Sequence, residues 1–296
     1  MVFVEKIPNM AKNVEKGNTK KVKFAVEEKK LKIFDKNSFN PEHILECGQI
    51  FSFDKKQDCY TVYSKDESAK ITEMEDGYEI ETESPKYFVE FFDLNTDYTK
   101  IKNKLKEFEI LKEPIKFGRG IRILKQDLFE TLISFIVSAN NNIKRIQLIL
   151  NRIRSAYGKD MGSYYAFPTR EELLKASEEE FKALGAGYRA TYLYKVLRQV
   201  DEETLHTWQE LPTAQLRQKL ISLSGVGPKV ADCILLFGYA RGDVFPVDTW
   251  IEKMYFKFYK SERQITREKI RENLTKEFGL LSGYAQQYLF YFMRAE

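Results

Sequence analysis

The sequence predicts an α+β fold, in which an N-terminal domain built on an antiparallel β-sheet precedes a mainly α-helical domain. Two observations predict this order. Short runs of alternating apolar and polar residues, such as 60–63 and 78–82, fill the first part of the chain, whereas apolar residues at helical spacing predominate after Tyr87. The composition is that of a globular protein, since 43% of the 296 residues are hydrophobic and 31% are charged.

The expected domain limits follow this change of pattern. Residues 1–20 are polar and have no period, so we expect a basic, poorly ordered extension. The antiparallel-sheet domain is expected over residues 21–124 and the helical domain over residues 125–296. One short helix should interrupt the strands, because Asn40 is a good cap and Pro41 suits the first helical position.

The starts of several later helices are well signalled. In the segments 127–130, 169–172 and 177–180, an oxygen-bearing cap residue stands three positions before a glutamate. At this spacing the two side chains can each accept a hydrogen bond from the other residue's backbone N–H group, which predicts a capping box at each site. Gly185 and Gly187 should then end one helix just before the next begins.

Charge is distributed unevenly along the chain although the net charge is only +4. Residues 41–99 carry 5 basic and 15 acidic side chains, whereas residues 100–154 carry 13 basic and 5 acidic ones. A polyanion would respond to the local basic excess, because screening limits the field to about 10 Å. A solvated helical face explains the same charges equally well.

The cysteine and histidine counts exclude several kinds of metal site. The chain has three cysteines and two histidines, His43 and His206, so a four-cysteine cluster is impossible and no paired ligand motif exists. Both histidines are interpreted as structural residues. No apolar run approaches the roughly 18 residues that span a membrane, and charge interrupts the first residues at Glu5. We therefore expect a soluble intracellular protein, in the cytoplasm or nucleoid if the source is bacterial.

The most informative stretch is residues 215–238, where two apolar-periodic helices flank Ser224-Gly225-Val226-Gly227 and Pro228 opens the second helix. The glycines permit positive φ and close backbone approach, and the proline lacks an N–H group that the helix start would leave unpaired. The remaining N–H groups would point outward at the positive end of the helix dipole, as in a phosphate site. An ordinary helix–helix turn is the alternative.

Residues 223–232, L-x-G-V-G-P-K-V-A-D, together with V-F-P-V-D-T-W at 244–250, resemble the helix-hairpin-helix (HhH-GPD) DNA glycosylases. Further stretches narrow the resemblance to the 8-oxoguanine DNA glycosylases, and they lie at residues 46–51, 117–127, 134–145, 184–190 and 284–290. The resemblance covers roughly residues 40–290 in the same order. Trp250 stands where many members carry histidine.

The resemblance implies that Lys229 is the nucleophile that captures C1′ of the sugar and that Asp248 offsets the positive charge developing there. Lys229 can attack only as a free amine, which apolar neighbours such as Val230 and Ile234 would favour. A lysine is an unusual structural choice for a helix's first turn, because the dipole there repels cations. Asp248 also has the sequence context of a helix N-cap, and that role holds in any case.

The resemblance also implies a base pocket. An extruded base would lie between Cys233 and Phe290, with its Watson–Crick edge read by Gln286. The Gly48 carbonyl would accept the N7–H group that distinguishes 8-oxoguanine from guanine. Without the resemblance, Cys233, Gln286 and Phe290 would each be assigned to the core and Gly48 to a turn.

Four further residues lie in segments that, by resemblance, contact the cytosine left unpaired: Asn140, Arg145, Tyr188 and Arg189. Tyr188 would wedge into the gap, and the two arginines would donate hydrogen bonds to cytosine. Three consecutive asparagines at 140–142 favour a functional turn over a helix or core.

The hairpin glycines that would approach a DNA phosphate are Gly225 and Gly227. The resemblance implies that hairpin carbonyls, those of Ile221, Leu223 and Val226, could hold a monovalent or calcium ion against the phosphate. No organic cofactor and no side-chain metal site are expected.

The function implied is that of a monomeric bifunctional DNA glycosylase and AP lyase. It would flip 8-oxoguanine out of double-stranded DNA, opposite cytosine, attack C1′ through Lys229 and cleave the strand by β-elimination from a Schiff base. Two alternatives remain open at this point. One is a helix-hairpin-helix glycosylase for another lesion, such as an alkylated base, and the other is a non-catalytic DNA-binding module.

Overall fold

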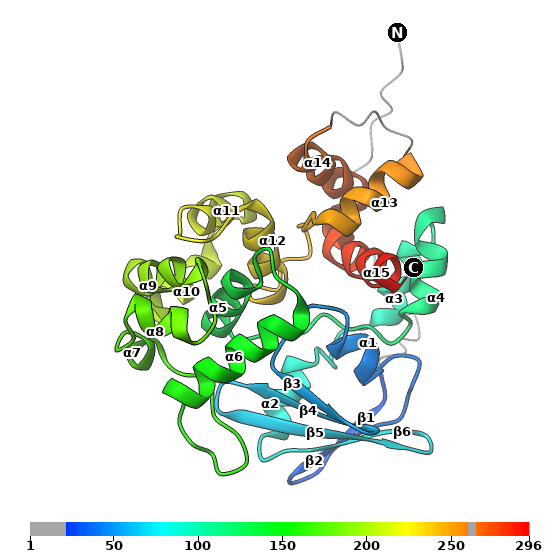
Figure 1. The fold of residues 1–296 in the computed structure, drawn as a ribbon. Helices are drawn as coiled ribbons and strands as arrows, with labels where there is room; N and C mark the ends of the chain where they lie inside the picture. Colours follow the sequence, from blue (N-terminus) through cyan, green and yellow to red (C-terminus); the bar gives the residue numbers. More distant parts are fainter. Residues whose placement is uncertain (1–21, 260–264, 296) are drawn as a thin grey trace.

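The structure, a computed structural model, describes residues 22–259 and 265–295. It confirms the α+β fold, because a six-stranded antiparallel sheet precedes a large helical part (Figure 1). The expectation for the extension at residues 1–20 lies outside the described residues.

The sheet has the strand order β1-β2-β6-β5-β4-β3, and every neighbouring pair is antiparallel. The strands are β1 (Phe24–Val26), β2 (Lys30–Ile33), β3 (Phe53–Lys56), β4 (Cys59–Ser64), β5 (Glu67–Met74) and β6 (Gly77–Glu81). Alternate residues face the core, such as Leu31 and Ile33 in β2 and Tyr60 and Val62 in β4, as their sequence pattern predicts. Two short helices border the sheet, α1 (Pro41–Leu45), capped by Asn40 as predicted, and α2 (Pro85–Phe91).

The helical part follows α3 (Tyr98–Leu105) and α4 (Lys112–Phe117). Its helices are α5 (Leu128–Ser138), α6 (Ile143–Tyr157), α7 (Arg170–Leu173), α8 (Glu178–Ala183), α9 (Arg189–Gln199), α10 (Glu202–Thr207), α11 (Thr213–Ile221), α12 (Pro228–Phe237), α13 (Thr249–Tyr259), α14 (Arg267–Phe278) and α15 (Ser282–Ala295). The capping boxes expected at Thr169 and Ser177 both form. The break between α8 and α9 lies at Gly185 and Gly187, as predicted.

The third expected capping box does not form. Asp127 caps α5 by accepting the N–H of Glu130, but the Glu130 side chain does not return to Asp127. It is buried and accepts hydrogen bonds from Ser52 Oγ at 2.7 Å and Arg154 Nη2 at 3.0 Å. The prediction failed because a buried arginine and a hydroxyl group from the sheet region compete for this carboxylate.

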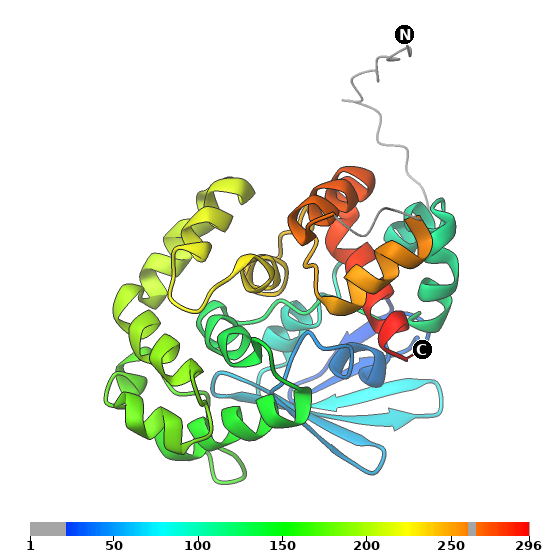
Figure 2. The ribbon, with the colours of Figure 1, turned by 45° about the horizontal axis from the view of Figure 1, so that its top comes forward.

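The hydrophobic core is divided into three clusters. One joins the sheet to α1 and α2, and a second joins α5, α6, α9, α11 and α12. The third joins α3 and α4 to α13, α14 and α15, so helices from both halves of the sequence share it (Figure 2). The domain limits of 21–124 and 125–296 therefore stay a prediction.

No helix in residues 22–259 and 265–295 has both the length and the apolar character needed to cross a bilayer.

Candidate active site

A small cavity of about 30 Å³ lies among α12, α15 and the turn that follows α1. The six residues predicted for catalysis and base recognition all line it: Gly48, Lys229, Cys233, Asp248, Gln286 and Phe290. The other lining residues are Phe237, Pro246 and Gln287. These residues come from sequence positions almost 250 apart, so the fold alone brings them together.

Lys229 and Asp248 lie at the starts of two helices that border the cavity. Lys229 is in the first turn of α12, half-buried, with its ammonium nitrogen 5.5 Å from the centre of the Phe135 ring. Asp248 Oδ1 accepts the N–H groups of Trp250 and Ile251 at 3.0 and 2.9 Å. Asp248 is therefore the N-cap of α13, as predicted, and its other carboxylate oxygen is not committed to that cap.

The hairpin has the predicted turn between α11 and α12, although only one of its glycines needs positive φ. Gly225 has φ +82°, and a Cβ atom there would lie 2.7 Å from Cβ of Tyr192. Gly227 has an extended backbone, is exposed, and has no atom within 4 Å of where a Cβ would lie. Val226 is buried and holds the turn on the core. The open space at Gly227 is therefore where an outside group can approach the start of α12.

Cys233 and Phe290 line the cavity from α12 and α15, respectively. Burial raises the pKa of the Cys233 thiol to about 11, so the side chain is a neutral surface and not a competing nucleophile. Phe290 packs directly on Gly48, since a Cβ at Gly48 would lie 2.9 Å from the ring. Gly48 has φ +80°, so a turn with close approach explains this glycine.

Gln286 carries a buried acceptor without a partner. The side chain is 5% exposed, and its Oε1 has no hydrogen-bond donor among the described residues. An unpaired buried carbonyl oxygen costs about 1–3 kcal/mol, so this atom is available to accept a hydrogen bond from a ligand that enters the cavity.

The cavity has room for about two water molecules and not for a purine. A base can therefore enter only if a lining side chain moves. Phe290 is the lining residue that contacts Gly48 and is itself only partly buried.

The three asparagines predicted to form a functional turn join α5 to α6. Asn141 donates to the carbonyl of Val137, and Asn142 caps α6 by accepting the N–H of Arg145. Asn140 is exposed and has φ +49°, an uncommon conformation for a residue other than glycine. Two of the three side chains thus have structural roles, and Asn140 is presented at the tip.

Arg189 is buried and hydrogen-bonded within the protein, and does not extend freely towards solvent. It is 4% exposed, and its guanidinium donates to the carbonyls of Ala139 and Asn140. Tyr188 is 53% exposed and donates to the same Ala139 carbonyl at 3.2 Å. Arg145 is exposed at the start of α6.

Tyr192 connects the asparagine turn to the hairpin, and the sequence analysis missed it. Its ring packs edge-on against Tyr188, with the centroids 5.8 Å apart, and its Cβ lies under Gly225. The asparagine turn, the start of α9 and the hairpin are therefore joined by direct contacts. The signal available was the spacing of four between Tyr188 and Tyr192, which places both on one face of α9.

The basic stretch at residues 100–154 does not form a single surface. Arg122 and Arg154 are buried, and Lys125 is paired with Asp93 at 2.9 Å. The remaining charges are divided between α3–α4 and α6. The exposed part of the basic excess therefore lies on solvated faces of α3, α4 and α6, and contact with a polyanion stays a prediction.

For the hairpin ion, the carbonyl of Leu223 already accepts the N–H of Val226 at 3.1 Å, although a carbonyl oxygen has a second lone pair. The described residues contain no group of three or more His, Cys, Asp or Glu side chains suited to a metal ion.

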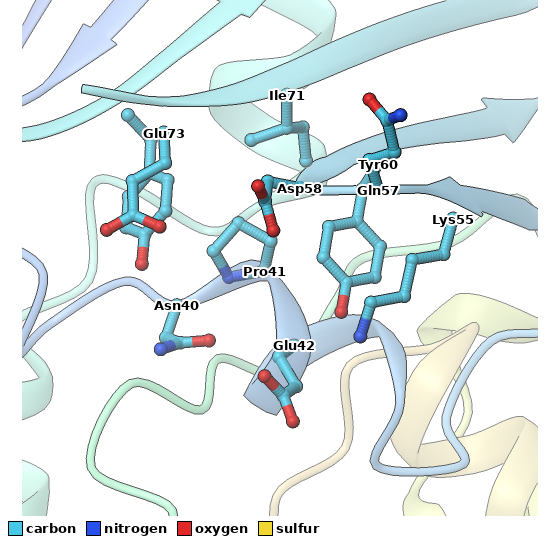
Figure 3. A pocket seen from close by; sticks show the side chains of 10 residues that line it. Asn40, Pro41, Glu42, Lys55, Gln57, Asp58, Tyr60, Ile71 and Glu73 are labelled. Carbon is cyan, nitrogen blue, oxygen red and sulfur yellow. The ribbon is translucent and has the colours of Figure 1, made fainter.

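A second cavity, of about 140 Å³, lies between α1 and the sheet, and its lining is shown in Figure 3. It contains none of the predicted site residues. Two of its side chains, Lys55 and Tyr60, both bond to the carboxylate of Glu46, close to the Gly48 turn.

Two family models match this chain. Residues 32–132 match the N-terminal domain of 8-oxoguanine DNA glycosylase, and residues 133–279 match the HhH-GPD superfamily of base excision DNA repair proteins.

Individual proteins are similar over much of the same range. An N-glycosylase/DNA lyase of Saccharomyces cerevisiae is 35% identical over 58% of this chain and 56% of the yeast protein. A probable N-glycosylase/DNA lyase of Methanothermobacter thermautotrophicus is 31% identical over 67% of this chain and 70% of the archaeal one. The Clostridium acetobutylicum 8-oxoguanine glycosylase/lyase, solved with double-stranded DNA containing cytosine opposite 8-oxoG, is 34% identical, with a TM-score of 0.87 over 93% of this chain and 99% of its own.

Proposed function

The chain belongs to the 8-oxoguanine DNA glycosylase/lyase family of the HhH-GPD superfamily, and on this premise we propose that it removes 8-oxoguanine opposite cytosine from duplex DNA and then cleaves the strand. The observation that carries the proposal is the convergence of Lys229, Asp248 and the unpaired Gln286 oxygen on one cavity.

In the first step, the free amine of Lys229 attacks C1′ of the flipped nucleotide. The bond between C1′ and the base breaks, the bonding electrons leave with the base, and the base takes up a proton. The bond between C1′ and O4′ then breaks, O4′ keeps the bonding electrons and takes up a proton, and the nitrogen gives up its protons, which leaves a Schiff base between Lys229 and C1′. Removal of a C2′ proton then expels the 3′ phosphate by β-elimination.

Asp248 stabilises the positive charge that develops at the sugar while the base departs. Its Oδ1 is held by two backbone N–H groups, which fix the carboxylate at the cavity edge. The N-cap thus positions the carboxylate, and the uncommitted oxygen is available to the sugar.

Base recognition would use the opposite walls of the cavity. The base would stack between Cys233 and Phe290 once Phe290 has moved off Gly48. Gln286 Oε1 would accept from the Watson–Crick N–H donors of the lesion, and the Gly48 carbonyl would accept N7–H. Guanine presents a lone pair at N7, which repels that carbonyl.

Recognition of the opposite cytosine would use the surface formed by the asparagine turn and α9. We assign Asn140, Arg145 and Tyr188 to direct contact. Arg189 holds the carbonyls behind Asn140, so its donation to cytosine requires that it exchange one of those bonds. Gly225 and Gly227 would approach a phosphate, and an ion held by hairpin carbonyls remains part of the proposal.

We also propose that the protein works inside a cell, where its DNA substrate is found, and that it acts as a monomer. A glycosylase for another lesion is less well supported, because Gly48 and Gln286 match the needs of 8-oxoguanine. A non-catalytic DNA-binding module would need neither Lys229 nor Asp248.

Borohydride trapping on an 8-oxoguanine:cytosine duplex tests the proposal, because borohydride reduces the Schiff base to a stable adduct. We expect a covalent adduct with the wild-type protein and none with Lys229→Gln, which should still bind the duplex through the hairpin backbone. An adduct that persists in Lys229→Gln would assign the amine elsewhere. Absence of excision by the wild-type protein would reject the activity itself.

A further inference from the structure

Helix α15 holds the two carbonyls that precede Gly48. Gln287, which is 1% exposed, donates through Nε2 to the carbonyl of Cys47 at 2.7 Å. Arg294 donates through Nη2 to the carbonyl of Glu46. The same helix carries Gln286 and so provides a wall of the cavity as well.

Gly48 itself packs against two side chains of α15. A Cβ at Gly48 would lie 2.9 Å from Phe290 Cε1 and 3.2 Å from Arg294 Nη1. That Nη1 atom is buried and has no hydrogen-bond partner among the described residues. The Gly48 carbonyl likewise accepts no hydrogen bond from the part of the chain that the structure describes.

The residues on either side of Gly48 are also fixed. The Gln49 side chain donates to the carbonyls of Ile44 and Arg122 and accepts the N–H of Leu124, all within 2.9 Å. The Glu46 carboxylate is bonded to the two side chains from β3 and β4 that Figure 3 shows beside the second cavity. The turn therefore has one free acceptor with a defined direction, the carbonyl of Gly48.

We propose that Gln287 and Arg294 are positioning residues that set the direction of the Gly48 carbonyl and thereby the discrimination between 8-oxoguanine and guanine. This inference rests on the proposed function, in which that carbonyl meets N7 of the base. Hydrogen bonds weaken steeply when the donor angle falls below about 120°, so a large rotation of this peptide plane would weaken both the attraction to N7–H and the repulsion of the guanine lone pair.

Binding measurements in a Lys229→Gln background test this role without catalysis. Gln287→Leu and Arg294→Met remove the donors and keep side chains of similar size. We expect the ratio of affinities for 8-oxoguanine:cytosine and guanine:cytosine duplexes to fall by about fivefold, the worth of one hydrogen bond. Affinity for the guanine:cytosine duplex should change by less than about twofold, and an unchanged ratio would overturn the proposal.

A second measurement distinguishes a role in orienting the Gly48 carbonyl from a general loss of structure in the variants. Cleavage of a preformed abasic site needs Lys229 but no base, so in proteins that keep Lys229 the two variants should cleave it at wild-type rates while excising 8-oxoguanine more slowly. Equal losses in both reactions would reject positioning. Lys276→Met, on the exposed face of α14, controls for the loss of one positive charge. If the wild-type protein cleaves abasic sites but does not excise 8-oxoguanine, the proposed function fails instead.

Discussion

Phe290 should matter more than Gln286 for the rate of base removal. A lost stacking partner typically costs about 1–3 kcal/mol and a lost hydrogen bond about 0.5–1.5 kcal/mol. We therefore expect single-turnover excision of 8-oxoguanine to fall more in Phe290→Ala than in Gln286→Ala, while abasic-site cleavage is retained by both. Wild-type excision rates in both variants would show that the base pocket is assigned wrongly.

His43 should make the protein less stable as the pH falls. Burial, with a smaller contribution from Arg119, lowers the pKa of His43 from 6.5 to about 4, and its neutral Nδ1 accepts the N–H of Gly120. Between these values the unfolded chain takes up a proton that the folded protein does not, so the free energy of unfolding decreases from pH 6.5 towards pH 4.

Urea unfolding at pH 7 and pH 5 checks this expectation. His43→Gln, which cannot titrate in this range, should lose less stability between the two pH values than the wild-type protein loses. Identical losses would remove His43 from the explanation.

At the scale of single residues, the sequence predicted which side chains line the cavity but not how each is used. The family resemblance carried by the hairpin motif pointed to Lys229 and Asp248, and both line the cavity, while their catalytic roles stay a prediction. Arg189 was expected to donate to cytosine, whereas it is buried and donates to carbonyls of a turn almost 50 residues away. Gln287 went unnoticed because its partner, Cys47, is distant in sequence.

The hairpin offers a matched pair of glycine substitutions. Gly225→Ala would put a Cβ into Tyr192 at positive φ, so we expect the free energy of unfolding to fall by about 1–3 kcal/mol. Gly227 has an extended backbone and open space but caps α12, where alanine is a poorer cap, so Gly227→Ala should lower stability by at most about 1 kcal/mol while duplex affinity falls. Duplex affinity unaffected by Gly227→Ala would place the phosphate elsewhere.

Substitutions in the asparagine turn and α9 can distinguish a residue that contacts the opposite base from one that only holds the protein backbone in place. Arg145→Ala should compress the preference for cytosine over adenine by about tenfold with little change in stability. Arg189→Ala should lower stability by about 1–3 kcal/mol, because it leaves the carbonyl of Asn140 without its donor and that of Ala139 with Tyr188 alone. Measuring the excision rate of 8-oxoguanine opposite each of the four bases tests these roles. A uniform loss of rate in Arg145→Ala would mean that Arg145 contacts only the DNA backbone.

At the scale of elements, local rules worked where local interactions decide the structure. Capping and turn signals placed α1, α7, α8 and the hairpin correctly. The rule failed at Glu130, because a bond to Arg154 in the protein interior outweighs a local bond at an exposed helix end.

Across the whole molecule, the carboxylate of Glu130 on α5 pairs with Arg154 on α6 and also accepts from Ser52 and the Lys65 N–H, so it joins the helical part to the sheet. Removing one partner of a buried pair leaves an unpaired charge, which typically costs about 3–5 kcal/mol. We expect Glu130→Ala to lower the free energy of unfolding by about this amount and Glu130→Ala/Arg154→Met to recover part of it. Lys29→Ala, in an exposed pair with Glu83, is the control and should change stability by less than about 1 kcal/mol.

A double-mutant cycle from urea unfolding measures the coupling between Glu130 and Arg154. A coupling near zero would mean that the carboxylate is held by Ser52 and the backbone alone.

At this scale the sequence predicted the order of sheet and helices but not the sharing of a core between α3, α4 and the last three helices. The hydrophobic periodicity of a helix does not show which other helix its apolar face contacts, since that depends on residues more than 100 positions apart.

The hydrogen bonds from α15 to the Gly48 turn also affect the order in which the parts of the site form while the chain is synthesised. They join residues 240 and 248 positions apart, and closing a loop of that length costs about 5 kcal/mol of chain entropy. During synthesis, Lys229 and Asp248 leave the ribosome before α15 does. A growing chain thus contains the amine that we propose as the nucleophile before it contains the helix that we propose distinguishes a damaged base from an intact one.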